Sequence, residues 1–195
     1  MKTRGAADGL DIRPLTPDRW DDLADLFGPR GASSGCWCVW TRLTRPEWRA
    51  AGPEGRREAF AGIVAQGPAP GLLGYREGRP VAWVAVAPRA ATPRFDAMEK
   101  SAPAAGVDPA RTYAITCFYT RAGARRGGLM RAMARAAVDH ARACGAAAVE
   151  VCAIEADRPL AWGEGFVGVA SVFRDLGFVE VARRTPRRPL MRLAF

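Results

Sequence analysis

The residues best suited to chemistry lie in one short stretch, residues 118–133, which combines glycine with arginine. Gly127 and Gly128 allow backbone N–H groups to approach a ligand without an intervening Cβ atom, and a predicted helix begins beside them. The unpaired N–H groups and the dipole at the start of a helix favour negative charge. Full positive charges that suit phosphate oxygens come from Arg125, Arg126 and Arg131. The pattern indicates an anion-binding turn, and the expected ligand is a diphosphate.

The same arrangement also describes ordinary β–α connections, in which glycine eases a turn and arginine is solvated. The local sequence leaves both interpretations open, so the elements on either side of the turn matter. Residues 113–120 are rich in β-branched and aromatic side chains, which predicts a central strand. Residues 147–154 predict a second buried strand. The helix between them makes a crossover, which places the two strands side by side in parallel.

The helix of this crossover is predicted over residues 128–144 and is closed by Gly145. Its apolar side chains recur at helical spacing, and the expected inner face consists of Leu129, Met133, Ala136, Ala137, His140 and Cys144. His140 is the only histidine of the chain, about three turns beyond the anion-binding turn. We therefore expect it to be structural rather than catalytic.

The rest of the chain supplies the other elements of a globular domain. A helix over residues 45–66 is expected to break at Gly52-Pro53, and a hairpin is predicted around Gly78. Residues 88–110 form a long connection of the kind often found in lids. The remaining predicted elements are a strand at 12–15, a helix at 17–27, a short helix at 170–176, and strands at 178–183 and 190–195.

Composition narrows the class of protein. The chain has 195 residues, a net charge of +9 that arginine dominates, and five dispersed cysteines. We expect a flexible tail over residues 1–10, a single domain over 11–195, no membrane segment, no metal and a cytoplasmic location. The charge alone permits a nucleic-acid-binding protein, but the arginines form no block with interleaved aromatics, so no nucleic-acid partner is expected.

The order of these elements resembles the GNAT superfamily of acyl-CoA-dependent N-acetyltransferases over nearly the whole chain. The most specific match is the superfamily signature Arg/Gln-x-x-Gly-x-Gly/Ala, here Arg125-Arg126-Gly127-Gly128-Leu129-Met130, in which Met130 replaces the last small residue. A second match is the closing helix and Leu-Gly-Phe turn at residues 173–181. Many members carry there a tyrosine that protonates the departing CoA thiolate. This chain has Phe173 instead, which has no proton to give.

The resemblance implies a mixed α/β (α+β) fold: a mostly antiparallel central sheet of about seven strands, with a splayed parallel pair and helices on both faces. It implies acetyl-CoA as co-substrate. The pyrophosphate would lie on the amides of residues 126–131, and the pantetheine arm would pair with the backbone of Phe118 and Thr120. The implied cofactor-binding set is therefore Phe118, Thr120, Arg125, Arg126, Gly127, Gly128, Leu129, Met130 and Arg131.

The expected activity is transfer of an acetyl group to the primary amine of a small-molecule or amino-acid-like acceptor by direct attack, in a monomer or homodimer. Glu155 is the first candidate for the general base, and Glu150 and Asp157 are further acidic candidates. Trp37 and Trp40 could line an acceptor site or plug the core. The alternative is a non-catalytic acyl-CoA binding or sensing module, because Phe173 removes the usual acid and no base is obvious.

Overall fold

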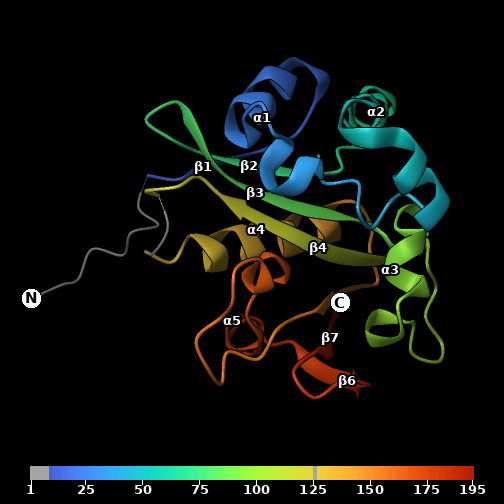
Figure 1. Ribbon diagram of the computed structural model, residues 1–195. Coiled ribbons are helices and arrows are strands. Elements are labelled where there is room, and N and C mark those ends of the chain that lie inside the picture. Colours follow the sequence, from blue (N-terminus) through green and yellow to red (C-terminus); the bar gives the residue numbers. More distant parts are fainter. Residues whose placement is uncertain (1–8, 125–126) are drawn as a thin grey trace, which may run out of the picture.

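The computed structural model of the protein describes residues 9–124 and 127–195 (Figure 1). In this part of the chain seven strands form one sheet in the order β1-β2-β3-β4-β5-β7-β6. Only β4 and β5 run in parallel, and every other neighbouring pair is antiparallel. The fold class predicted from the sequence is confirmed. The strands are β1 Asp11–Pro14, β2 Gly71–Arg76, β3 Arg79–Pro88, β4 Thr112–Thr120, β5 Ala148–Cys152, β6 Val179–Arg183 and β7 Pro189–Ala194.

Helices cover both faces of the sheet, with α1 and α2 above it and α4 and α5 below it in Figure 1. Their bounds are α1 Trp20–Phe27, α2 Arg45–Gln66, α3 Pro93–Ala97, α4 Leu129–Ala143 and α5 Ala170–Asp175. Two main clusters of buried apolar side chains result. One lies between α4 and the sheet around Met133 and Ile115, and the other lies under α1 and α2 around Phe60 and Trp83. Leu10 packs against the first cluster.

Local sequence signals fix several of these elements. α2 begins with a capping box between Thr44 and Glu47, and it is interrupted at Gly52, whose φ of 59° only glycine adopts easily. The β2–β3 hairpin turns through Glu77 and Gly78, both with positive φ, as the favoured two-residue turns require. The predicted helix break and hairpin are therefore both present.

The inner face of α4 differs from the predicted one. Its buried residues are Leu129, Met133, Ala134, Ala137, Val138 and Ala141. Cys144 is exposed, and the prediction that it faces inward is wrong because Cys144 is the C-cap residue, beyond the last residue of α4 that packs on the sheet, Ala141. His140 is half-buried, and burial lowers the pKa of its imidazole.

A buried ion-pair cluster holds the start of the 88–110 connection against the sheet. Arg89 and Glu150 are both fully buried and pair with each other. Arg89 also contacts Asp96 at 2.7 Å, and Arg192 contacts Glu150 at 2.7 Å. The Arg89 side chain further donates a hydrogen bond to the carbonyl of Ser101 at 2.7 Å. The connection is thus anchored at several points along its first half.

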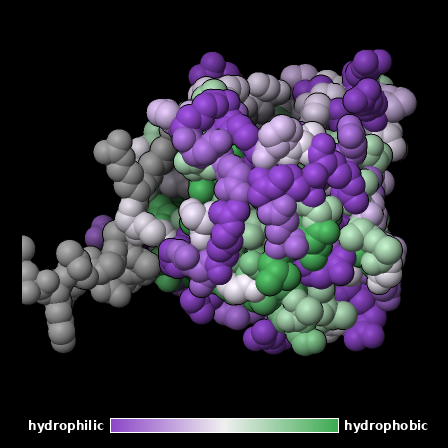
Figure 2. Space-filling view, turned by 90° about the horizontal axis from the view of Figure 1, so that it is seen from below, coloured by the Kyte–Doolittle hydropathy of each residue, from purple (hydrophilic) through white to green (hydrophobic). Residues whose placement is uncertain are grey.

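Polar and charged side chains are spread over the surface. Figure 2 shows the face below the sheet as a mixture of hydrophilic side chains and a smaller hydrophobic area. Among the described residues, no helix combines the length and the apolar composition that a membrane crossing requires.

Candidate functional site

The two parallel strands separate part-way along their length. β4 and β5 pair only from Thr112 opposite Ala148 to Ile115 opposite Val151. Beyond that point Ile154 forms its parallel bridge with Val169 instead. The second half of β4 therefore has a sheet neighbour on the β3 side and an open edge on the other side, where peptide groups are available to a ligand.

A β-bulge lies where the strands part. Cys117 pairs with Ala85 and Ile115 pairs with Val86, so Thr116 is the extra residue of β4. A bulge bends its strand and changes which side chains face each side of the sheet. Ile115 and Phe118 both pack in the α4 cluster, whereas Cys117 joins the α1–α2 cluster. The bulge therefore turns Phe118 toward α4.

The start of α4 faces this open edge without a side-chain cap. Gly128 is the N-cap residue, with φ 78° and ψ 4°, and as a glycine it has no side chain that could accept a hydrogen bond from the first-turn N–H groups. A Cβ atom built on Gly128 would meet nothing within 4 Å, so the backbone here borders open space. Gly127 also has a positive φ, of 86°. The first-turn N–H groups are thus positioned to receive an anion.

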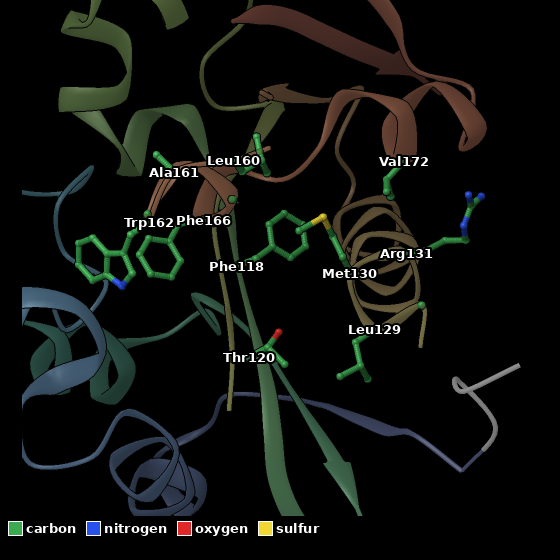
Figure 3. A pocket seen from close by; sticks show the side chains of 13 residues that line it. Phe118, Thr120, Leu129, Met130, Arg131, Leu160, Ala161, Trp162, Phe166 and Val172 are labelled. Carbon is green, nitrogen blue, oxygen red and sulfur yellow. The ribbon is translucent and has the colours of Figure 1, made fainter. Parts of the chain in front are cut away.

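A cleft of about 610 Å³ lies between β4, the start of α4 and the 160–166 loop (Figure 3). Six predicted cofactor-binding residues line it: Phe118, Thr120, Gly128, Leu129, Met130 and Arg131. Gly127 is next to the lining residues in sequence but is not one of them. Arg125 and Arg126 lie outside the described residues. The structure therefore brings the strand end and the helix start together, as the sequence predicts.

Two lining side chains have partners within the protein. Arg131 pairs with Asp175 of α5, and Figure 3 shows its guanidinium pointing away from the cleft. Met130, which replaces a small residue of the motif, points its thioether toward Phe118, and its sulfur accepts a hydrogen bond from the N–H of Val169 at 3.4 Å. The thioether thus occupies space in the cleft, while the backbone of the first turn stays open.

The opposite wall comes from a loop that the sequence did not mark as functional. Leu160, Trp162 and Phe166 line the cleft, and 79% of Trp162 is exposed. The Phe166 ring stacks against Tyr119 of β4 with 6.4 Å between centroids. The available signal was the alternation of aromatic residues with glycine over residues 162–166, which favours an apolar ligand-binding wall.

Comparison with known proteins agrees with this geometry. A family model described as the acetyltransferase (GNAT) family matches residues 37–163, more than half of the chain. The protein belongs to the GNAT acetyltransferase family. A comparison with curated proteins finds no match.

Solved structures with the GNAT fold resemble the whole chain. The GNAT domain of S. lividans PAT is 15% identical, with a TM-score of 0.55, over 94% of this chain and 89% of that one. A GCN5-related N-acetyltransferase from Kribbella flavida is 16% identical, with a TM-score of 0.55, over 96% and 99%. The PaiA N-acetyltransferase from Thermoplasma acidophilum, solved in complex with coenzyme A, is 9% identical, with a TM-score of 0.52, over 95% and 99%. At these identities the likeness shows the fold alone.

The acidic residues considered as bases in this GNAT protein are engaged elsewhere. Glu155 pairs with Arg174 and Arg183, and these contacts, the hydrogen bond from Arg174 first, lower the pKa of its carboxyl group. Glu150 belongs to the buried cluster with Arg89, and Asp157 contacts Arg187 at 2.8 Å. None of the three acids lines the cleft, in which Arg131 is the only ionisable lining residue described.

Phe173 is fully buried in this GNAT fold. Its ring lies 6.1 Å from Phe118 and 5.2 Å from Phe178, centroid to centroid. A Cβ atom on Gly168 would approach the Phe173 ring to 2.6 Å, so glycine is needed for this packing. Phe173 therefore supports the cleft from below β4 and supplies no proton.

The two predicted acceptor-site tryptophans lie away from the cleft. Trp37 is 5% exposed and packs in the core, with its ring 6.0 Å from Trp20. Trp40 is 41% exposed and borders a separate cavity with Arg94. Two roles were considered for this region, lining an acceptor site and filling the core. The position of Trp37 corresponds to the second.

Proposed function

We propose that this GNAT protein is an N-acetyltransferase that transfers the acetyl group of acetyl-CoA directly to the primary amine of a small-molecule or amino-acid-like acceptor. One observation carries the proposal: a helix start without a side-chain cap opens, through Gly128, into a cleft whose other side is the free edge of β4. This pairing offers anion-binding amides and strand-like amides in one site.

The residues present fit such a co-substrate. The backbone amides of residues 128–131 would hold the diphosphate, because the missing Cβ of Gly128 lets it approach. The β4 edge at residues 116–120 would pair with the amide groups of the pantetheine arm. A β4 backbone N–H near the bulge would stabilise negative charge on the thioester oxygen. Acetyl-CoA supplies the activated acyl group.

Positioning, rather than a built-in base, would supply most of the rate. Arg131 is the only ionisable residue among the described lining residues, and it pairs with Asp175. The acceptor amine would therefore attack the thioester carbonyl in its neutral form and lose its proton to water, while the C–S bond breaks and CoA leaves as a thiolate that takes up a proton from water. We propose a cytoplasmic enzyme, monomer or homodimer, with no nucleic-acid partner. The alternative to water as proton acceptor is Glu155, although its ion pairs with arginine lower the pKa of its carboxyl group and so oppose proton uptake.

A second candidate function is an acyl-CoA binding or sensing module without turnover. Two observations favour it: Phe173 cannot donate a proton to a departing thiolate, and the described lining of the cleft holds no proton acceptor. Both functions share the same ligand and the same amides, so binding alone does not separate them.

Two measurements on the same protein distinguish the possibilities. Acetyl-CoA should raise the melting temperature, and chromatography should detect free CoA when members of a panel of small amines are added. A melting shift without any CoA release supports the sensing module. The absence of a melting shift contradicts both functions.

A further inference from the structure

A second cavity, of about 760 Å³, lies between the start of α2, the α3 segment and the turn that joins β6 to β7. It shares no lining residue with the cleft described above. Three cations and one acid line it: Arg45, Arg94, Lys100 and Glu99. We call it the cationic pocket. The excess of positive charge suits an anion.

Arg94 is held in place within the cationic pocket. Its guanidinium carbon lies 3.4 Å from the centroid of the Trp40 ring, and Trp40 in turn meets Trp48 edge-on at 4.9 Å. The backbone N–H of Arg94 donates a hydrogen bond to the carbonyl of Thr41 at 3.1 Å. Yet the Nη1 atom of Arg94 is shielded from solvent and has no hydrogen-bond partner among the described residues. The guanidinium is therefore positioned but incompletely satisfied.

Thr185, on the other side of the cationic pocket, also has a side-chain atom without a hydrogen-bond partner among the described residues. Its Oγ1 atom is buried and lacks a hydrogen-bond partner within the described part of the chain. Buried polar atoms in folded proteins are nearly always paired, so each exception calls for an explanation. Here two unpaired donors, from segments far apart in the sequence, belong to residues that line one cavity. Both atoms are shielded from solvent, so a bound oxyanion would accept hydrogen bonds from them only after the two side chains turn toward the cavity.

The positive charges of the cationic pocket also crowd one another. Burial, followed by the nearby charges of Arg45 and Arg49, lowers the pKa of Arg94. Burial, followed by the charge of Arg188, lowers the pKa of Lys100. Repulsion of this kind is relieved when an anion binds between the cations. Glu99, the only acid among the described residues of the lining, is exposed.

We propose that the cationic pocket binds a small polyanion that carries carboxylate or phosphate groups. Arg94 and Thr185 donate the hydrogen bonds, and Arg45 and Lys100 supply counter-charge. Three cations against one acid favour a ligand with at least two negative charges. Trp40 acts as the platform that holds the Arg94 guanidinium flat. This site is independent of the proposed acetyl transfer.

Calorimetric titration of the full chain with citrate and with pyrophosphate, at constant ionic strength, tests the site. We expect saturable binding of at least one anion, and the preferred one reports whether carboxylate or phosphate is recognised. Arg94→Gln should weaken binding roughly tenfold or more, and Thr185→Val should weaken it several-fold. Arg135→Gln, which removes an equal charge from an exposed position on α4, should bind like the wild type.

Gly128→Glu blocks the other anion-binding candidate, the start of α4, and should leave citrate binding unchanged. Melting temperatures without ligand establish that each variant is folded, and Thr185→Val, which keeps its shape, guards against misfolding of Arg94→Gln. Three outcomes overturn the proposal: no saturable binding of either anion, wild-type affinity in both pocket variants, or loss of binding only in Gly128→Glu.

Discussion

Replacing Gly128 with glutamate places a carboxylate at the start of α4, where the diphosphate is proposed to bind. The cost to folding should be small. A side chain at a φ of 78° costs about 1–2 kcal/mol, and a carboxylate at a helix N-terminus recovers about 0.3–1 kcal/mol. The space around the new Cβ atom is open, so no clash adds to this cost. We expect the unfolding free energy to fall by about 1 kcal/mol.

The effect on acetyl-CoA binding should be much larger. One carboxylate about 4 Å from one phosphate charge, in the dielectric typical of a protein surface, is repelled by about 4 kcal/mol. This repulsion corresponds to a roughly thousandfold increase in the dissociation constant. Calorimetry measures the affinity, and the melting temperature with and without acetyl-CoA gives a second, independent measure. Gly128→Glu should show almost no melting shift.

Gly145→Glu is a matched control at the other end of α4. Gly145 also has a positive φ, of 81°, and open space around a built Cβ atom, so strain and added charge are the same. It should bind acetyl-CoA like the wild type. Gly128→Ala adds the strain without the charge and should lose at most about tenfold in affinity. Wild-type affinity in Gly128→Glu, or equal losses in Gly128→Glu and Gly145→Glu, would refute the reasoning.

Three further predictions concern charged and thiol groups. Glu150→Gln leaves buried Arg89 without its carboxylate partner, so urea unfolding should show a loss of about 3–5 kcal/mol, against less than about 0.5 kcal/mol for exposed Glu99→Gln. The pKa of Glu155 is lower in the folded than in the unfolded state, so its ion pairs stabilise the fold at pH values above the unfolded-state pKa. This stabilisation is lost as the pH falls through the folded-state pKa. The stability difference between wild type and Glu155→Gln, below about 1 kcal/mol at neutral pH, should therefore vanish in acid, and a difference that persists there contradicts the assignment. Burial raises the pKa of Cys36 to about 11, so iodoacetamide at mildly alkaline pH should modify exposed Cys144 and spare Cys36, as peptide mass spectrometry can check. Equal labelling of the two would be inconsistent with the structure.

Elements set by local signals could be predicted from the sequence. The break of α2 at Gly52, the hairpin turn at Gly78 and the start of α4 at Gly128 each depend on a glycine with positive φ, and glycine is visible in a sequence. The parallel pairing of β4 and β5 follows from the crossover between them. The strand side and the helix side of the cleft were therefore both foreseen.

Features that depend on contacts between distant segments could not be predicted. The bulge at Thr116 is a property of pairing with β3, and no residue type near it requires a bulge. Asp175 pairs with Arg131 only because α5 lies beside α4. The buried position of Arg89 likewise depends on Glu150 in a different strand. For the same reason, the role of the aromatic loop around Trp162 as a wall of the cleft depends on its position beside β4 and across from α4.

The contact between the α4 amides and the co-substrate can be observed directly by NMR. Backbone ¹⁵N–¹H resonances of the protein should be followed while acetyl-CoA is added, with the amides of Gly128, Leu129, Met130 and Arg131 as reporters and those of the α4 C-terminus as reference. We predict saturable shifts at these four amides, with little change near Ala143. Saturable binding that leaves the four amides unmoved and shifts resonances elsewhere would contradict the proposed site.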